Sequence, residues 1–243
     1  MAASGPVREE RKAVNETQVT REPGGDEARL RYGILGGTFD PPHLGHLVLA
    51  QEALIHLRLE RVWFVPTGAP PHKPNRQVSS HDDRRAMVER AIAGNPRFAL
   101  SAIELERSGP SYSVDTLAQL RREWGESVSM SFIMGWDMLT YLPQWRQPEQ
   151  VIATLDRIVA THRPGFTVDP EEIAQLERAL PGLSGKLAIL AAPQVDVSST
   201  EIRHRVASGV PIRYLVSDSV RSYIEEHGLY RSDNLSESGG ADL

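Results

Sequence analysis

Two histidines, His43 and His46, stand three residues apart directly after a glycine-rich turn. The turn follows the short apolar run 32–35 and reads Gly36, Gly37, Thr38, Phe39, Asp40, Pro41, Pro42. Glycines let backbone N–H groups approach a phosphate, and the start of a helix adds unpaired amides and the positive end of its dipole. Side chains three apart share one helix face. The segment therefore predicts a phosphate site at a strand-to-helix junction, where both histidines donate to the same phosphate.

Zinc binding is the main alternative interpretation of the two histidines. The chain contains no cysteine, which excludes disulfides, thiolate catalysis and thiolate metal sites. The histidine pair also lacks an acidic third ligand at helical spacing. An isolated HxGH pattern more often caps a helix or packs in a core, but here it is part of a much longer motif, for which chance is a poor explanation. We therefore predict no metal site built from protein side chains.

Cationic and hydroxyl side chains follow later apolar runs. Lys73 lies in the loop 66–80, which is rich in proline, glycine and polar residues and is suited to closing over a ligand; a solvated turn lysine is the alternative. Ser198 and Glu201 form a Ser-x-x-Glu pattern that predicts a helix starting at about Ser198. Arg203 on that helix can make the bidentate phosphate contact that lysine cannot, although a capped helix alone also explains the pattern.

Four more residues have both a ligand-binding and a structural interpretation. Ser113 lies in a turn that leads into a helix, where its hydroxyl could be an ordinary N-cap. Trp145 follows a proline, and a tryptophan beside a sheet is more often core than ligand platform. Asp137 follows an apolar run and could cap a helix, and Arg163 could be a surface cation before its Pro-Gly turn.

The string at 36–46, GGTFDPPHLGH, resembles the (H/T)xGH signature of the nucleotidyltransferase superfamily. In this longer form it is similar to the nicotinate-nucleotide adenylyltransferases of NAD biosynthesis. Four further segments resemble that family in the same order: PPHKP at 70–74, GPSYSVDT at 109–116, LPQW at 142–145 and VSSTEIR at 197–203. The resemblance extends over residues 31–231. Three positions depart from the family pattern. Val197 replaces isoleucine, and Ser113 stands where threonine is commoner. Trp136 is the middle residue of a Gly-x-Asp motif, where the family usually has a smaller residue.

The resemblance also implies a role for each matching residue. It implies four catalytic residues, which are His43, His46, Lys73 and Arg203. It implies ATP contacts from Gly36, Gly37, Thr38, Phe39, Gly45, Gly135, Asp137, Arg163, Ser198, Ser199 and Thr200. It implies that nicotinate mononucleotide is bound by Tyr112, Ser113, Trp145 and Lys73, with the indole of Trp145 stacked on the pyridine ring.

The implied reaction is adenylyl transfer from ATP to nicotinate mononucleotide, giving nicotinate adenine dinucleotide and pyrophosphate. The attacking group is already a phosphate oxygen, so in-line positioning and charge neutralisation suffice, and no general base is needed. We expect Mg²⁺ as cofactor, held mainly through the ATP phosphates. The alternatives are another acceptor, such as nicotinamide mononucleotide or phosphopantetheine, and a nucleotide-sensing regulatory protein of the same fold.

Alternating strand and helix patterns must position these residues. We expect strands near 32–36, 61–65, 98–101, 128–134, 156–161 and 186–190, and helices at 44–57, 82–93, 113–123 and 219–226. This alternation predicts a Rossmann-like α/β fold: a doubly wound, mainly parallel sheet with a small C-terminal helical part. In such sheets ligands bind outside the carboxyl ends of the strands, where the strand order reverses, and the motifs above all follow strands.

Length, composition and charge indicate the number of domains and the kinds of partner. The chain has 243 residues, 40% of them hydrophobic, enough for one sizeable domain, which we place at 31–231. The polar stretches 1–30 and 232–243 predict a disordered leader and tail. The net charge of −5 argues against nucleic-acid or anionic-membrane partners. Without an apolar signal core or a long apolar run, we expect a cytoplasmic protein; homo-oligomerisation stays open.

Overall fold

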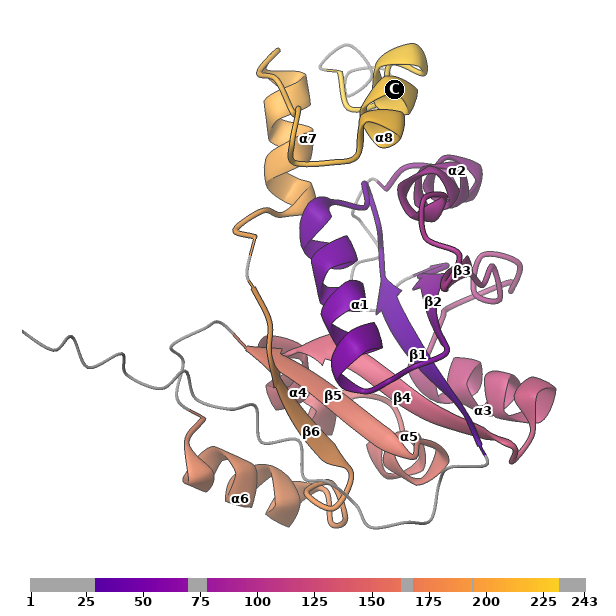
Figure 1. The fold of residues 1–243 in the computed structure, drawn as a ribbon, viewed down its shortest axis with the longest axis vertical. Coiled ribbons are helices and arrows are strands. Elements are labelled where there is room, and N and C mark those ends of the chain that lie inside the picture. Colours follow the sequence, from indigo (N-terminus) through magenta and orange to yellow (C-terminus); the bar gives the residue numbers. More distant parts are fainter. Residues whose placement is uncertain (1–28, 70–77, 163–167, 194, 232–243) are drawn as a thin grey trace, which may run out of the picture.

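The computed structural model describes residues 29–69, 78–162, 168–193 and 195–231. Six strands form one sheet in which every neighbouring pair is parallel, in the order β3-β2-β1-β4-β5-β6 (Figure 1). Their bounds are β1 (Leu30–Gly37), β2 (Arg61–Pro66), β3 (Phe98–Leu100), β4 (Val128–Gly135), β5 (Arg157–His162) and β6 (Leu187–Ala191). The predicted doubly wound fold and all six predicted strands are confirmed.

Eight α-helices and one short 3₁₀ helix are found in the described ranges. They are α1 (Leu44–His56), α2 (His81–Ile92), α3 (Ser113–Trp124), α4 (Trp136–Tyr141), η1 (Leu142–Gln144), α5 (Pro148–Thr154), α6 (Pro170–Ala179), α7 (Ser199–Ala207) and α8 (Asp218–Glu226). The predicted helices match α1, α2, α3 and α8, and α7 begins directly after Ser198 as its capping pattern indicates. The helices α4, α5 and α6 were not predicted from the sequence.

The sheet is buried on both faces. Along β1, Ile34 packs into the core on one face and the next residue, Leu35, into the core on the other, because successive side chains of a strand point to opposite faces. Helices α1 and α2 cover the Leu35 face, whereas α3, α5 and α6 cover the Ile34 face. The same alternation continues in the neighbouring strands with Phe132, Ile133, Ile158 and Val159.

The strand order reverses beside β1. From β1 the chain passes through α1 to β2 and then to β3, and it returns through α3 to β4 on the opposite side of β1. Consecutive connections therefore leave β1 in opposite directions, and this arrangement opens a crevice at the carboxyl ends of β1 and β4. Gly37 ends β1 and Gly135 ends β4 at this edge.

The C-terminal helical part lies beyond this edge of the sheet. Helices α7 and α8 stand next to α2 at the top of Figure 1, and they share a third apolar cluster with it. Met87 of α2, Ile202 of α7 and Ile224 of α8 are each buried in that cluster. Arg90 of α2 also lies 4.3 Å from the ring centroid of Tyr223 on α8. The helices are therefore packed onto the domain.

The first described residues are tied to the sheet. β1 begins at Leu30, and Arg29 donates to Asp156 at 2.7 Å. The predicted domain limits stay a prediction. Residues 1–28 and 232–243 lie outside the described ranges. None of the described helices has the length and apolar character needed to cross a membrane.

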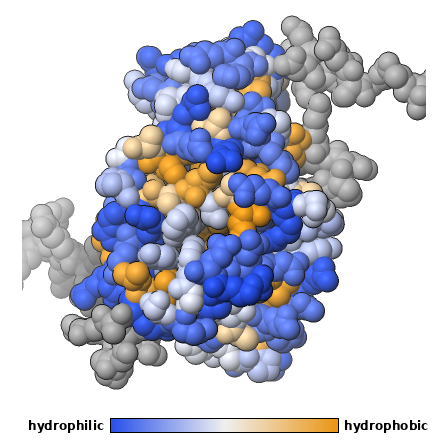
Figure 2. Space-filling model, turned by 90° about the vertical axis from the view of Figure 1, so that its right-hand side faces the viewer, coloured by the Kyte–Doolittle hydropathy of each residue, from blue (hydrophilic) through white to orange (hydrophobic). Residues whose placement is uncertain are grey.

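Apolar residues gather around the middle of the face shown in Figure 2, while its upper part is mostly hydrophilic. The large hydrophobic side chains that are exposed in the described part of the chain are Leu30, Ile55, Met138, Tyr141, Val195, Val210 and Tyr214. Two of them, Met138 and Tyr141, line the cavity described below. Homo-oligomerisation therefore stays a prediction.

Candidate active site

A cavity of about 460 Å³ opens at the carboxyl ends of β1 and β4, where the strand order reverses. One end is lined by Gly36, Gly37, Thr38 and His46, from the glycine turn and α1. The other part, which we call the aromatic end, is lined by Tyr112, Tyr141 and Trp145, and Phe132 lies between the two parts, because its ring packs on Trp145 and would lie 3.5 Å from a Cβ at position 36. Ser113 and Gly135 lie along the walls. The fold thus brings the phosphate-type and ring-type segments, which are far apart in the sequence, into one cavity.

His46 presents one defined nitrogen as a donor. Its Nδ1 accepts a hydrogen bond from the backbone N–H of His43 at 3.1 Å. A nitrogen that accepts a hydrogen bond carries no proton, so the neutral ring holds its proton on Nε2. Burial, followed by the neighbouring His43, lowers the pKa of His46 well below its usual range. His46 therefore lines the cavity as a neutral N–H donor near pH 7.

His43 stacks on His46. The two ring centroids are 3.7 Å apart with an interplanar angle of 23°. Burial lowers the pKa of His43 to about 4. Its Nδ1 is buried and has no hydrogen-bond partner among the described residues. A Cβ at position 45 would lie 3.1 Å from that nitrogen, so Gly45 leaves room for the ring. The two rings are thus paired, but His43 is the N-cap that precedes α1, so only His46 lies in the helix, and only His46 lines the cavity.

The glycine turn supplies backbone to the cavity and one side chain to the core. Phe39 adopts a positive φ of 50°, and its ring packs edge-on against His46 with centroids 4.9 Å apart. The Phe39 side chain is buried and does not line the cavity. An ATP contact by Phe39 would therefore involve its backbone. Gly36, Gly37 and Thr38 do line the cavity, as the sequence predicts for a phosphate turn.

The start of α7 packs against the end of this turn. Ser198 Oγ accepts from the backbone N–H of Glu201 at 3.1 Å, which confirms the predicted N-cap. Ser199 Oγ donates to the carbonyl of Pro41 at 2.8 Å. Arg203 Nη1 donates to the carbonyl of Asp40 at 2.7 Å, and Nη2 to Thr200 Oγ1 at 3.2 Å. The α7 residues thus flank the phosphate end of the cavity without lining it.

The segment after β4 only partly matches its prediction. Gly135 is the N-cap of α4 and lines the cavity, so Asp137 is not the cap. Asp137 is exposed in the first turn of α4 and is not among the residues that line the cavity. Trp136 is buried in the core cluster, so its size does not shape the cavity directly.

The predicted acceptor residues come together at the aromatic end. Tyr112 is the N-cap of α3 and Ser113 is its first residue. Trp145 follows η1, and its ring packs edge-to-face on Phe132 with centroids 5.9 Å apart. All of them line the same cavity. The remaining predicted site residues, Lys73 and Arg163, lie outside the described residues.

Arg84 is a site residue that the sequence analysis missed. Its side chain is almost fully buried and donates to four backbone carbonyls, those of Thr38, Thr67, Gly68 and Ser79. It therefore ties the phosphate turn after β1 to the loop after β2 and to the start of α2. Burial is the largest influence on the pKa of Arg84 and lowers it. The sequence did contain a signal: Arg84 precedes the apolar residues Met87 and Val88 by three and four positions, and this spacing places all three on one face of a helix.

Glu104 is a second missed residue. Its carboxylate lines the cavity and accepts from Thr116 Oγ1 at 2.8 Å. Burial raises the pKa of Glu104, and this hydrogen bond opposes the rise. No motif marks Glu104, since only the folding of its loop against α3 places it here.

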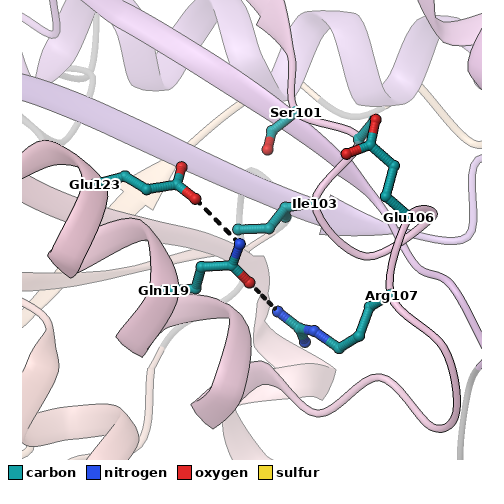
Figure 3. Close-up of a pocket in the computed structure, with 7 residues that line it drawn as sticks. Ser101, Ile103, Glu106, Arg107, Gln119 and Glu123 are labelled. Atoms are coloured by element: carbon teal, nitrogen blue, oxygen red, sulfur yellow. Dashed lines mark hydrogen bonds between the residues drawn. The ribbon is translucent and has the colours of Figure 1, made fainter.

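A second, polar cavity lies between the β3–α3 segment and α3 (Figure 3). Its polar side chains bond one another: Arg107 donates to Gln119 at 2.8 Å, and Gln119 donates to Glu123 at 3.1 Å. None of the predicted site residues that the structure describes lines this cavity. We therefore place the active site in the cavity at the β1 and β4 ends.

The chain is similar in sequence to proteins of known family. The cytidylyltransferase-like family model matches residues 34–205. A protein of Geobacillus thermodenitrificans named "Probable nicotinate-nucleotide adenylyltransferase" is 46% identical over 201 residues, covering 82% of this chain and 86% of its own length. A Dehalococcoides mccartyi protein of the same name is 44% identical and covers 83% and 97%.

Solved structures are similar in fold. The nicotinic acid mononucleotide adenylyltransferase of Plasmodium falciparum, complexed with NaAD, superposes with a TM-score of 0.64 at 18% identity. The match covers 83% of this chain and 98% of that one. At 18% identity this structural similarity supports the fold alone, whereas the sequence matches at 44–46% identity show family membership. The chain belongs to the cytidylyltransferase-like superfamily and, within it, to the nicotinate-nucleotide adenylyltransferase family.

Proposed function

We propose that this chain transfers the adenylyl group of ATP to nicotinate mononucleotide, giving nicotinate adenine dinucleotide and pyrophosphate. One observation carries the proposal: a single cavity joins the glycine and histidine end, suited to phosphates, to the aromatic end, suited to a flat ring. Family membership supports the same reaction. The reaction requires both kinds of site within reach of each other.

The displacement depends on placing the attacking oxygen in line with the α-phosphorus more than on acid–base catalysis. A phosphate oxygen of the mononucleotide attacks the α-phosphorus of ATP, and the bond to the bridging oxygen breaks so that pyrophosphate leaves. The attacking oxygen carries its own negative charge, so no base has to remove a proton. His46 donates its Nε2–H to the α-phosphate, where charge develops in the transition state. His43 stacks on His46 and supports that orientation.

The departing phosphates are held by cations at the rim of the cavity. Arg203 lies beside the phosphate turn and currently donates to the Asp40 carbonyl and to Thr200. Its planar fork matches two phosphate oxygens. Lys73 is expected to assist from the loop after β2. Backbone groups of Gly36, Gly37 and Thr38, which line the cavity, contact the nucleotide in this proposal.

Mg²⁺ neutralises phosphate charge in this proposal. The described residues contain no group of three or more histidine or acidic side chains placed to hold a metal ion. Asp40, a buried carboxylate in the phosphate turn, is already bonded to Tyr230, and Glu104, the buried carboxylate in the cavity lining, is bonded to Thr116. This donor set fits an ion that is held by ATP oxygens and water, as is common for Mg²⁺.

The test is pyrophosphate release from ATP and Mg²⁺ with nicotinate mononucleotide, nicotinamide mononucleotide or phosphopantetheine supplied separately. Release that strongly favours nicotinate mononucleotide, with the dinucleotide found by mass, is the expected result. Release with phosphopantetheine alone would reassign the acceptor. A folded protein that binds ATP but releases pyrophosphate with none of them would support the regulatory alternative.

A further inference from the structure

The aromatic end of the cavity contains one cationic side chain. Among the described residues that line the cavity, Arg146 is the only lysine or arginine. It directly follows Trp145, and its guanidinium carbon lies 4.5 Å from the ring centroid of Tyr112. The cation therefore lies over one aromatic side chain of the cavity lining and is adjacent in sequence to another.

The donors of Arg146 are available to a ligand. None of its N–H groups bonds to another described residue, and its guanidinium lies over the face of the Tyr112 ring. A contact with an aromatic face leaves the in-plane donors of a guanidinium unused. The next residue, Gln147, is in the left-handed region at φ 51°, and α5 starts at Pro148, so the backbone turns sharply just after Arg146.

Charge in the cavity is balanced between two residues. Glu104 is the only aspartate or glutamate among the described residues that line it. His46 also lines the cavity, but its lowered pKa keeps it neutral near pH 7. Removing the charge of Arg146 would thus leave no permanent positive charge among the described residues that line the cavity, which would disfavour an anionic ring substituent.

We propose that Arg146 is a specificity-determining residue that favours an acceptor whose ring carries a carboxylate over the matching amide. The inference rests on the proposed function and deepens it. A carboxylate and a carboxamide have nearly the same shape, so packing against Trp145 or Tyr112 separates them poorly, whereas a nearby cation separates them by charge. Because Arg146 is exposed and screened by solvent, we expect a moderate preference of about five- to tenfold from it.

The experiment compares two substrates that differ only at the ring substituent. For wild type and R146Q we would measure kcat/KM with nicotinate and with nicotinamide mononucleotide. The ribose and phosphate are common to both, so the ratio of the two values isolates the substituent. We expect the ratio to fall about five- to tenfold in R146Q, almost entirely through loss with the nicotinate substrate. R146K should keep part of the preference, since it keeps the charge but loses the planar fork.

A matched control and a salt series separate charge from a structural effect. Arg122 is also exposed, lies on α3 and does not line the cavity, so R122Q should leave the ratio unchanged. In wild type the ratio should decline as salt rises from about 0.05 to 0.5 M, because salt screens an exposed charge. R146Q should show a nearly flat salt dependence. If R146Q acted only through a packing defect, the ratio in wild type would not depend on the salt concentration.

Failure of this inference is distinguishable from failure of the proposed function. An unchanged ratio in R146Q overturns the inference, and so does an equal loss with both substrates, which would place Arg146 on the shared ribose phosphate. Calorimetric binding of the two mononucleotides gives the same ratio without turnover. If wild type binds neither mononucleotide, both proposals fall. If it binds them but forms no dinucleotide, the reaction is wrong while the role of Arg146 is still decided by the binding ratio.

Discussion

The hydroxyl of Tyr230 donates a 2.6 Å hydrogen bond to Oδ1 of Asp40, which lies 190 positions earlier in the chain. Asp40 is only 2% exposed, and its backbone carbonyl accepts from Arg203. Burial, and then the charge of Asp40, raises the pKa of Tyr230, so the hydroxyl stays a donor. One buried aspartate therefore holds both the C-terminal segment and the α7 arginine against the phosphate turn.

Tyr230→Phe should loosen this support. The change leaves a buried carboxylate oxygen without its donor, which costs about 1–3 kcal/mol of unfolding free energy. Arg203 should then be held less well, and we expect KM for ATP to rise several-fold with a smaller change in kcat. Urea unfolding and steady-state kinetics measure the two effects. Tyr214→Phe is the control because Tyr214 is 78% exposed. Equal stability of the two variants would contradict the role of the Tyr230 hydroxyl.

Arg84→Lys should impair both stability and activity. A lysine cannot reach all four carbonyls that the guanidinium bonds, so buried carbonyls lose partners and the unfolding free energy should fall by about 2–4 kcal/mol. The phosphate turn and the loop after β2 would then be less firmly joined, which should lower kcat at temperatures where the variant stays folded. The adjacent Arg85→Lys, on the exposed face of α2, should behave as wild type. A stable, fully active Arg84→Lys enzyme would show that these carbonyl contacts are dispensable.

His46→Asn should separate the two roles of the histidine. Asparagine Oδ1 can accept the His43 N–H in place of Nδ1, but it supplies no donor at the position of Nε2. We therefore expect a folded protein, less stable than wild type because the ring contacts with His43 and Phe39 are lost, together with a loss in kcat of about 10²–10³-fold, typical of removing one transition-state donor. Single-turnover formation of the dinucleotide measures the loss. The exposed His204→Asn on α7 should leave kcat unchanged, and near-normal turnover by His46→Asn would overturn the assignment.

Stability should depend on pH through His43. Its pKa falls to about 4 in the folded state, against about 6.5 when unfolded. The unfolded chain thus binds more protons between these values, so stability is complete above pH 6.5 and declines as the pH falls toward 4. The decline from this residue should approach about 3 kcal/mol at 1.36 kcal/mol per pKa unit. Urea unfolding at several pH values should show a shallower decline for His43→Asn, and parallel curves would rule out this contribution.

Gly68→Ala tests the contact between two loops beside the cavity. A Cβ at position 68 would lie 2.2 Å from the carbonyl oxygen of Glu104 and 2.6 Å from Ser111 Oγ. Backbone must therefore move, and we expect a loss of about 1–3 kcal/mol in unfolding free energy, together with a higher KM for the mononucleotide. Gly94→Ala is the matched control because nothing lies within 4 Å of a Cβ there. A Gly68→Ala protein as stable as that control would refute the close approach.

Helix prediction succeeded where a local signal was used and failed elsewhere. Ser198 marks the start of α7 because its Oγ bonds an amide only three residues away. The helices α4 and α5 have six and seven residues, too few for an apolar period to be recognised. For α6 a signal was available, since Asp169 caps it and Pro170 occupies its first position.

The sequence by itself determined the strand-and-helix alternation, the phosphate turn and the pairing of His43 with His46, because each depends on residues within one or two turns of one another. Only the tertiary structure decided which distant residues support the site. Arg84 bonds the Thr38 carbonyl across 46 positions, and Tyr230 bonds Asp40 across 190. Arg146 lines the cavity because the fold brings the residue after Trp145 to the start of α3, where its guanidinium lies over the ring of Tyr112. Such contacts arise from the packing of whole elements, and no spacing within a short segment encodes them.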